Sequence, residues 1–174
     1  MYLLSNSRLK GKIAITVVGC GGTGSLVSES LCRLLLARPD AVLVLVDHDR
    51  VEDQNIGRQN FHPAEVGRFK RQALAERLSR LYGREVRYST APWSTALWRE
   101  VYRPPWGNGM TSVEGGVVVG CVDNALARAA ILESLTREGT AMVDTCWWLD
   151  AGNGRDSGQV LIGNATRERL QGGG

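Results

Sequence analysis

Unbroken apolar runs and helically spaced apolar residues alternate along most of this chain. The unbroken runs, which are typical of strands covered on both faces of a parallel sheet, occur at 13–18, 41–46 and 116–122. After each run, apolar side chains return at helical spacing and predict helices that end near residues 36, 82 and 139. The inward faces of the first two helices are predicted to carry these side chains: Val27, Leu31, Leu34 and Leu35, then Leu74, Leu78 and Leu81.

Shorter segments complete the predicted order of elements. Further strands are expected at 85–89, 141–144 and 157–163, with a turn at Gly152-Asn153-Gly154 before the last of them. The stretch 90–115 is rich in tryptophan and proline, with one short helix near 94–102, and it is either a cover over the sheet or a partner-binding insertion. Together the elements predict an α/β fold, with a doubly wound, mainly parallel, Rossmann-like sheet in a single domain.

A glycine-rich turn joins the first predicted strand to its helix. Gly19, Gly21 and Gly24 have the G-x-G-x-x-G spacing, which lets the backbone approach a phosphate group closely. The helix that follows would point its first N–H groups at such an anion. Because the same pattern serves NAD, FAD, S-adenosylmethionine and ATP, the rest of the chain has to decide the cofactor.

Charged residues at the strand ends favour a nucleoside triphosphate. Asp47 follows the second apolar run, where this fold places the carboxylate that binds a ribose; the alternative is a loop aspartate that caps a turn. Lys70 lies in the first turn of a helix, where its positive charge opposes the helix dipole. A nearby anion would offset the cost of this position. Arg58 and Lys70 would neutralise the β- and γ-phosphates, and Asp123 would bind Mg²⁺. An NAD-dependent dehydrogenase needs none of these three residues.

Composition narrows the class of protein further. The chain has 174 residues, of which 43% are hydrophobic, which suits one α/β domain. The net charge is +3 and the basic residues are scattered, so nucleic acid is not the expected partner. Four cysteines form no C-x-x-C pair, which favours reduced thiols in a cytoplasmic protein, and no apolar run is long enough to cross a membrane.

Six short motifs together resemble one known family, the ThiF/MoeB adenylyltransferases and the adenylation domains of ubiquitin-activating-type enzymes. They are V-V-G-C-G-G-T-G at 17–24, L-V-D-H-D at 45–49, N-I-G-R-Q at 55–59, V-G-R-F-K at 66–70, C-V-D-N at 121–124 and S-G-Q-V at 157–160. Within this family, the G-G-T-G-S and N-x-G-R-Q-N-F forms and the W-W-L-D-A-G-N run at 147–153 look most like the ThiF-type proteins of PRTRC plasmid systems.

The resemblance implies ATP- and Mg²⁺-dependent adenylation of a C-terminal carboxylate, usually the Gly-Gly end of a ubiquitin-like or sulfur-carrier protein. It also implies a homodimer. The residues that match family nucleotide-site positions are Gly21, Gly22, Gly24, Asp47, Asp49, Asn55, Arg58, Gln59, Lys70, Asp123 and Asn124, to which the glycine spacing adds Gly19. Arg58, Lys70 and Asp123 are the expected catalytic residues, and Asp123 is the expected ligand of Mg²⁺.

The chain also departs from that family. It lacks the paired C-x-x-C ligands of many relatives, so we expect no structural zinc, and it lacks a cysteine after the G-Q-V strand, so we expect no thioester. Residues 1–174 would then be a ThiF-type adenylation domain without the carboxyl-terminal part of its relatives. Arg8 is a candidate to reach a partner subunit's site. Two alternatives remain, namely an ATP-binding module without transfer chemistry and an NAD-dependent oxidoreductase.

Overall fold

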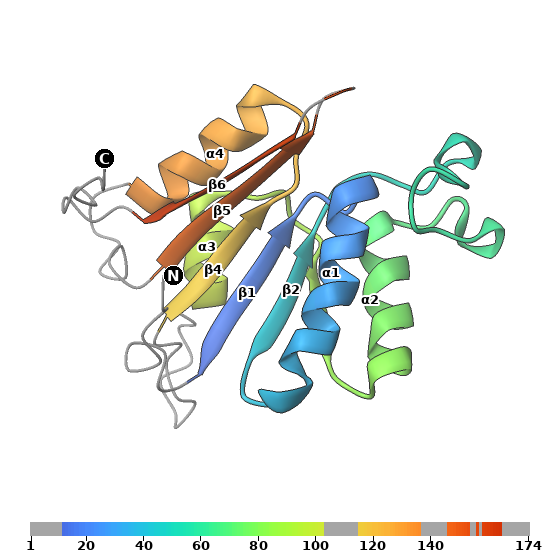
Figure 1. The fold of residues 1–174 in the computed structure, drawn as a ribbon, viewed down its shortest axis with the longest axis horizontal. Helices are drawn as coiled ribbons and strands as arrows, with labels where there is room; N and C mark the ends of the chain where they lie inside the picture. The colour runs from blue at the N-terminus through green and yellow to red at the C-terminus, as the bar shows by residue number, and fades with distance from the viewer. Residues whose placement is uncertain (1–11, 103–114, 137–145, 154–155, 157, 165–174) are drawn as a thin grey trace.

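The sheet of this protein has six strands in the order β3-β2-β1-β4-β5-β6 (Figure 1). The computed structural model describes residues 12–102, 115–136, 146–153, 156 and 158–164. Five strands are parallel, and β6 runs antiparallel to β5. The bounds are β1 Ile13–Val18, β2 Val42–Val46, β3 Val86–Ser89, β4 Gly115–Gly120, β5 Cys146–Asn153 and β6 Gly158–Asn164. The predicted doubly wound, mainly parallel sheet in a single domain is thereby confirmed.

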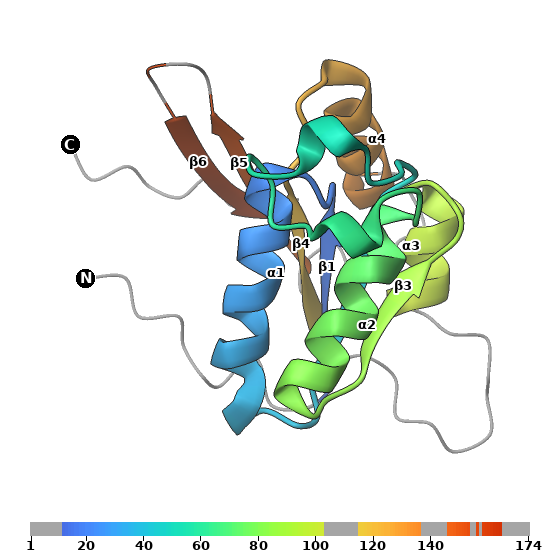
Figure 2. The same ribbon diagram turned by 90° about the vertical axis from the view of Figure 1, so that its right-hand side faces the viewer.

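Helices cover both faces of this sheet. One face carries α1 (Gly22–Leu34) and α2 (Lys70–Tyr82), and the other carries α3 (Thr95–Tyr102) and α4 (Ala125–Thr136), as Figures 1 and 2 show. Short 3₁₀ turns occur at η2 (Leu35–Ala37), η3 (Asp53–Asn55) and η4 (Pro63–Glu65). Among the described helices, none has the length and apolarity that a membrane crossing needs.

The central strand β1 separates two apolar clusters. All six of its side chains are buried, because β2 and β4 pair with its two edges and helices cover both faces. The first cluster, towards α1 and α2, contains Leu43 and Leu74, and the second, towards α3 and α4, contains Trp98 and Ile131. The strand order reverses between β1 and β4, so ligands of this fold bind outside the carboxyl ends of these two strands.

The predicted helix faces were wrong at two leucines. Leu34 is 71% exposed and Leu81 is 65% exposed, whereas Leu35 and Leu78 are buried. At the end of α1 the chain tightens into η2, and Leu35 takes the inward place. At the end of α2 the inward place belongs to Tyr82, which packs against the first cluster. Helical spacing alone does not show which residue of a last turn still lies over the sheet.

The carboxyl-terminal strands were predicted less well than the first ones. The predicted strand 141–144 lies outside the described residues, and β5 instead begins at Cys146 and includes Gly152 and Asn153, which were assigned to a turn. Similarly, β4 ends at Gly120, so Cys121 lies in the turn after the strand rather than inside it. The polar residues Asp150 and Asn153 interrupt the apolar pattern of β5, and pairing with β4 and β6 determines its length instead.

The described tryptophans of the stretch 90–115 are core residues. Trp93 is 9% exposed and Trp98 is 0% exposed. The Trp93 indole Nε1 donates to Ser134 Oγ of α4 at 3.1 Å, and the Trp98 ring stacks on Tyr102 with centroids 5.5 Å apart. These side chains therefore offer no exposed patch for a dimer, and Trp106 lies outside the described residues. The homodimer stays a prediction from family resemblance.

Candidate functional site

The glycine turn between β1 and α1 is packed so tightly that two of its residues have to be glycine. Gly19 has φ +93°, and a Cβ there would lie 2.7 Å from the Cys121 carbonyl oxygen. A Cβ on Gly24 would lie 1.8 Å from the Gly19 carbonyl oxygen. Helix α1 starts without a side-chain cap bond at Gly21 and without an acidic residue in its first turn. The positive end of its dipole therefore has no carboxylate in that turn to compensate it.

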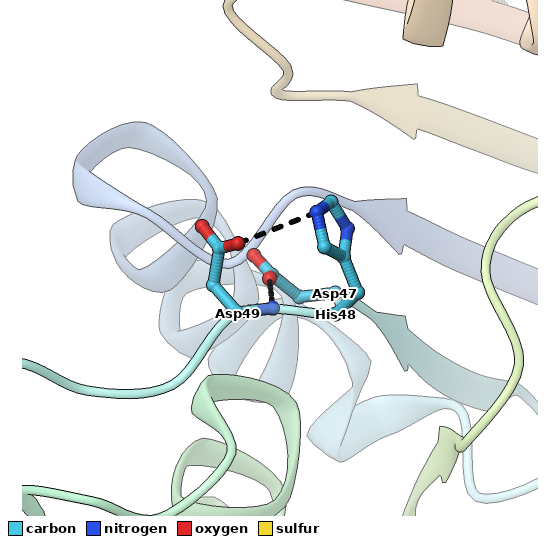
Figure 3. Close-up of side chains that lie close together, drawn as sticks. All are labelled: Asp47, His48 and Asp49. Carbon is cyan, nitrogen blue, oxygen red and sulfur yellow. Dashed lines mark hydrogen bonds and ion pairs between the residues drawn. The ribbon is translucent and has the colours of Figure 1, made fainter.

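Asp47, at the end of β2, is hydrogen-bonded to this turn. Its Oδ2 accepts the backbone N–H of Cys20 at 2.6 Å. Its Oδ1 accepts the backbone N–H of Asp49 at 2.7 Å, as Figure 3 shows. This geometry is compatible with both predicted roles of Asp47, the turn cap and the ribose-binding carboxylate. The carboxylate caps the turn with two of its roughly four lone-pair sites, and the others remain as acceptor sites. Those remaining sites suit a ribose hydroxyl.

Lys70 pairs with Asp49 beside this carboxylate. Lys70 is the first residue of α2 and is only 7% exposed. Its Nζ lies 3.1 Å from Asp49 Oδ2, and its backbone N–H donates to the Asp49 carbonyl at 2.9 Å. The anion that offsets the unfavourable helix-dipole position of this lysine is thus a carboxylate of the protein itself. The Asp49 side chain is 53% exposed and the Lys70 side chain only 9%, so the carboxylate end of the pair faces solvent.

The acidic residues and His48 lie close enough together to suggest a metal. Ligand atoms of Asp47, His48 and Asp49 lie within 4.8 Å of one another, and His48 Nε2 is 3.4 Å from Asp49 Oδ1 (Figure 3). Asp49 already pairs with the Lys70 ammonium, however, and the side chains of His48 and Asp49 are exposed. We therefore assign no metal to this cluster.

The loop after β2 contains Asn55, Arg58 and Gln59, and the last two of them lie near the glycine turn. Asn55 is 3% exposed, its side-chain Oδ1 accepts the N–H of Glu52 at 2.9 Å, and its carbonyl accepts the N–H of Gln59 at 2.9 Å. The Gln59 Nε2 lies 3.9 Å from the place of a Cβ on Gly21. The Gln59 Oε1 is buried and accepts no hydrogen bond within the described part of the chain. Arg58 is exposed, and its Nε donates to the Gln54 carbonyl at 2.8 Å.

A set of polar contacts that sequence analysis missed anchors this loop to α1 and α2. Arg77 Nε lies 3.1 Å from Glu65 Oε1, and Asn60 Nδ2 donates to Glu29 Oε2 at 3.1 Å. Burial alone would raise the pKa of the Glu29 carboxyl, but hydrogen bonds from Tyr82 and two further side chains lower it. These partners are far apart in sequence and form no motif, so only the fold reveals them.

Asp123 and Asn124 lie on the other side of the glycine turn, in the short connection between β4 and α4. Asn124 Oδ1 accepts the N–H of Ala127 at 2.8 Å and so caps α4. Asn124 Nδ2 lies 3.5 Å from Asp123 Oδ1, at the limit of a hydrogen bond, and Asp123 is exposed. The Asp123 carboxylate thus offers solvent-facing oxygen ligands of the kind that Mg²⁺ prefers.

Sequence analysis also missed an ion pair beneath Asp123. Arg128 Nε lies 3.0 Å from Asp150 Oδ2, and Arg128 Nη2 donates to the Val122 carbonyl at 2.7 Å. Asp150 is 5% exposed. Of the predicted site residues, the glycines, Asp47, Asp49, Asn55, Gln59, Lys70, Asp123 and Asn124 lie around the carboxyl ends of β1, β2 and β4. The Arg58 side chain is exposed and bonds within its own loop, and Arg8 lies outside the described residues.

The four cysteines are free thiols, and burial dominates their chemistry. Burial, together with the nearby Asp47 carboxylate, raises the pKa of the Cys20 thiol well above its usual value. Burial also raises the pKa of Cys146 to about 12 and those of Cys32 and Cys121 to about 11. All four thiols are therefore protonated at neutral pH, when they are poor nucleophiles.

Comparison with known proteins shows the family of this chain. The sequence pattern of the ThiF family matches residues 6–161. This chain belongs to the ThiF family. It is 33% identical over 138 residues to ubiquitin-like modifier-activating enzyme 5 of Arabidopsis thaliana, covering 75% of this chain and 31% of that protein. Against the same enzyme of Oryza sativa subsp. japonica, identity is 30% over 171 residues, covering 93% and 38%. The chain thus spans about a third of the length of these curated relatives.

Solved structures of two E. coli proteins share the fold. The E. coli tRNA N6-threonylcarbamoyladenosine dehydratase TcdA, in complex with AMP, matches with a TM-score of 0.61 at 22% identity, over 84% of this chain and 53% of TcdA. E. coli MccB with ATP matches with a TM-score of 0.57 at 19% identity, over 84% and 38%. At these identities the likeness establishes the architecture. The closeness to PRTRC-system proteins stays a prediction.

Proposed function

We propose that this ThiF-family chain uses Mg²⁺ and ATP to adenylate the C-terminal carboxylate of a ubiquitin-like or sulfur-carrier protein. The observation that carries the proposal is the hydrogen bond from Cys20 N–H to Asp47 Oδ2, which fixes a ribose-type carboxylate against a glycine turn. Lys70, the first residue of α2, pairs with Asp49 two residues further along the chain and brings a positive charge to this end of β2. The names of the relatives, which activate ubiquitin-like modifiers or were solved with AMP or ATP, support the same chemistry.

Different residues of the site would bind different parts of ATP. The remaining acceptor sites of Asp47 suit the ribose hydroxyls, and the start of α1 suits the phosphates. The buried Gln59 Oε1 is an acceptor for a nucleotide donor group. Lys70 and Arg58 would neutralise the β- and γ-phosphates. Asp123 would hold Mg²⁺, which when bound neutralises phosphate charge and helps pyrophosphate to leave.

The proposed reaction needs little from the protein beyond positioning. A carboxylate oxygen of the carrier attacks the α-phosphorus, the bond to the β-phosphate oxygen breaks, and pyrophosphate leaves with that electron pair. Because the carboxylate is already ionised at pH 7, no general base is needed. The chain therefore contributes alignment of carboxylate and ATP, together with cations placed where negative charge grows.

ATP–pyrophosphate exchange tests the proposal. The chain is mixed with ATP, Mg²⁺, labelled pyrophosphate and each of a panel of carriers that end in Gly-Gly, and the matched control is the same carrier with its terminal carboxylate converted to an amide. We expect exchange only with the free carboxylate. Binding of ATP without exchange for any carrier would favour the alternative of a binding module. Binding of NADH in place of ATP would favour an oxidoreductase.

A further inference from the structure

Arg128 connects three parts of the site. It lies in the first turns of α4, its Nε contacts Asp150 of β5 at 3.0 Å and 3.3 Å to the two carboxylate oxygens, and its Nη2 donates to the Val122 carbonyl at 2.7 Å. Val122 directly precedes Asp123, the residue proposed to hold Mg²⁺. One guanidinium therefore joins a helix, a strand and the backbone beside the metal-binding carboxylate.

The Asp150 end of this pair is fixed by packing. Asp150 is directly opposite Gly120 in the β4–β5 register. A Cβ on Gly120 would lie 2.9 Å from Asp150 Oδ1 and 3.0 Å from Trp148 Nε1, so the absence of a side chain at 120 leaves the space that this carboxylate occupies. The Asp150 side chain is 7% exposed and the Arg128 side chain is 30% exposed. The guanidinium thus contacts a buried, closely packed carboxylate.

The turn that bears Asp123 is otherwise held at its two ends. The Cys121 N–H donates to the Val18 carbonyl at 2.8 Å, and Asn124 caps α4 through the N–H of Ala127 at 2.8 Å. Between these two points, within the described residues, the Arg128 bond to the Val122 carbonyl is the contact that restrains the backbone next to Asp123. Replacing a buried ion pair by apolar residues is often neutral or stabilising, so fold stability alone is a weak explanation for it.

We propose that Arg128 is a positioning residue, which holds the Val122–Asp123 backbone so that the Asp123 carboxylate faces Mg²⁺-bound phosphate. This inference rests on the proposed function, because it assigns the partner of Asp123. Arg128 acts through Asp123 and touches neither ATP nor the metal in this role. Its loss should weaken the effect of Mg²⁺ on ATP binding more than it weakens ATP binding itself.

Calorimetric titration with ATP, in Mg²⁺ and in EDTA, measures that effect as a ratio of two affinities. Arg128→Met should reduce the ratio by about tenfold, the lower end for residues that orient a metal ligand. The matched control is Arg84→Met. Like Arg128, Arg84 donates to backbone carbonyls, those of Leu35 and Ala41, but it lies before the amino ends of β2 and β3. Arg84→Met should leave the ratio within twofold of wild type.

Further variants separate positioning from folding. Because Arg128→Met leaves Asp150 as a buried unpaired charge, Arg128→Met/Asp150→Asn serves where the single variant fails to fold. Arg128→Lys keeps one cation and should rescue only part of the ratio, because one ammonium group replaces a fork that reaches two acceptors. In an Asp123→Asn background, adding Arg128→Met should change the ratio no further.

Hydrogen exchange supplies a second readout that needs no ATP. In the apo protein, Arg128→Met should speed amide exchange at residues 122–124 and leave the β1 amides protected, whereas Arg84→Met should not change exchange at 122–124. An unchanged ratio in a folded Arg128 variant would overturn this inference alone. Equal losses with Mg²⁺ and with EDTA would likewise overturn it and assign Arg128 a purely structural role. A wild-type chain without any Mg²⁺ effect would instead overturn the proposed function together with this inference.

Discussion

The Asp47 Oδ2 accepts the backbone N–H of Cys20 at 2.6 Å, which ties the end of β2 to the glycine turn that follows β1. The two strands are neighbours in the sheet, with Val46 opposite Val18 in register. One carboxylate thereby ties the turn to β2 and keeps further acceptor sites. The turn geometry and, in the proposed function, ribose binding therefore depend on the same side chain.

Asp47→Ala should weaken ATP binding by roughly 1–3 kcal/mol, since it leaves polar groups of the turn and the nucleotide unpaired. Calorimetry measures the affinity, and circular dichroism checks that the variant folds. Asp40→Ala is the matched control, because Asp40 pairs with Arg38 on the surface, before the amino end of β2, whereas Asp47 follows its carboxyl end. Unchanged ATP affinity in a folded Asp47→Ala protein would remove Asp47 from the site.

Gly24→Ala should disrupt the turn, whereas Gly22→Ala should be tolerated. The added Cβ would lie 1.8 Å from the Gly19 carbonyl oxygen in the first variant but 3.7 Å from the Arg58 carbonyl oxygen in the second, which is an ordinary contact. We expect Gly24→Ala to lower the free energy of unfolding by about 1–3 kcal/mol or more. Urea denaturation of both variants measures the difference. Equal stability of the two would contradict the packing described for this turn.

Lys70→Ala should lower kcat for adenylation by about 100-fold or more with a smaller change in KM for ATP, because negative charge on departing pyrophosphate grows toward the transition state. Arg58→Ala should act in the same direction. Lys70→Arg should rescue only in part, since a planar guanidinium differs from a compact ammonium. Steady-state kinetics of pyrophosphate release measures both parameters. A raised KM with an intact kcat would mean that Lys70 serves ground-state binding instead.

No thioester should form on this chain. Cys146 is 2% exposed and its thiol has a pKa of about 12, and it precedes rather than follows the G-Q-V strand β6. Incubation with ATP and a cognate carrier, followed by non-reducing electrophoresis, should show no thiol-sensitive adduct. Cys146→Ala should retain pyrophosphate exchange. An adduct that disappears in Cys146→Ala would make this cysteine a nucleophile after all.

The buried thiols should also make the fold sensitive to alkali. Their pKa values are raised from 9.0 to about 11 for Cys32 and Cys121 and to about 12 for Cys146. Above pH 9 the unfolded chain loses thiol protons that the folded chain keeps. The contribution of these thiols to the free energy of unfolding is therefore fully present below pH 9 and is lost as pH rises toward 11–12. Urea denaturation from pH 8 to 10.5 should show this decline. Cys146→Ala should make it shallower, and an identical decline would exclude Cys146 as a cause.

The sequence predicted the first half of the fold well, because strands buried on both faces leave an unmistakable apolar run, as at Ile13–Val18 and Val42–Val46. It predicted β5 poorly, because Asp150 and Asn153 interrupt that pattern. Leu34 and Leu81 were misplaced because a last helical turn can extend past the sheet that it covers. Local pattern thus identifies the elements but not where tertiary contact ends.

Part of the candidate site could be predicted from the sequence and part could not. Asp47, Lys70 and Asp123 could be selected because strand ends and helix starts are positions with known geometry, and in the structure they follow β2, begin α2 and follow β4. The partner of Lys70 could not be foreseen as Asp49, whose side chain is 21 residues away in the chain. Nor could the pairing of Arg128 with Asp150, which depends on the register between β4 and β5.

The strand order has a consequence for synthesis on the ribosome. One edge of β1 pairs with β2 at Val42–Val46, but the other edge pairs with β4, and Ile13 lies opposite Gly115. At a translation rate of about 5–20 residues per second, the central strand waits roughly 5–20 s with an unsatisfied edge after it has emerged. During that interval β1, β2 and β3 can assemble with α1 and α2, while the nascent sheet still exposes the hydrogen-bonding groups that β4 will later cover.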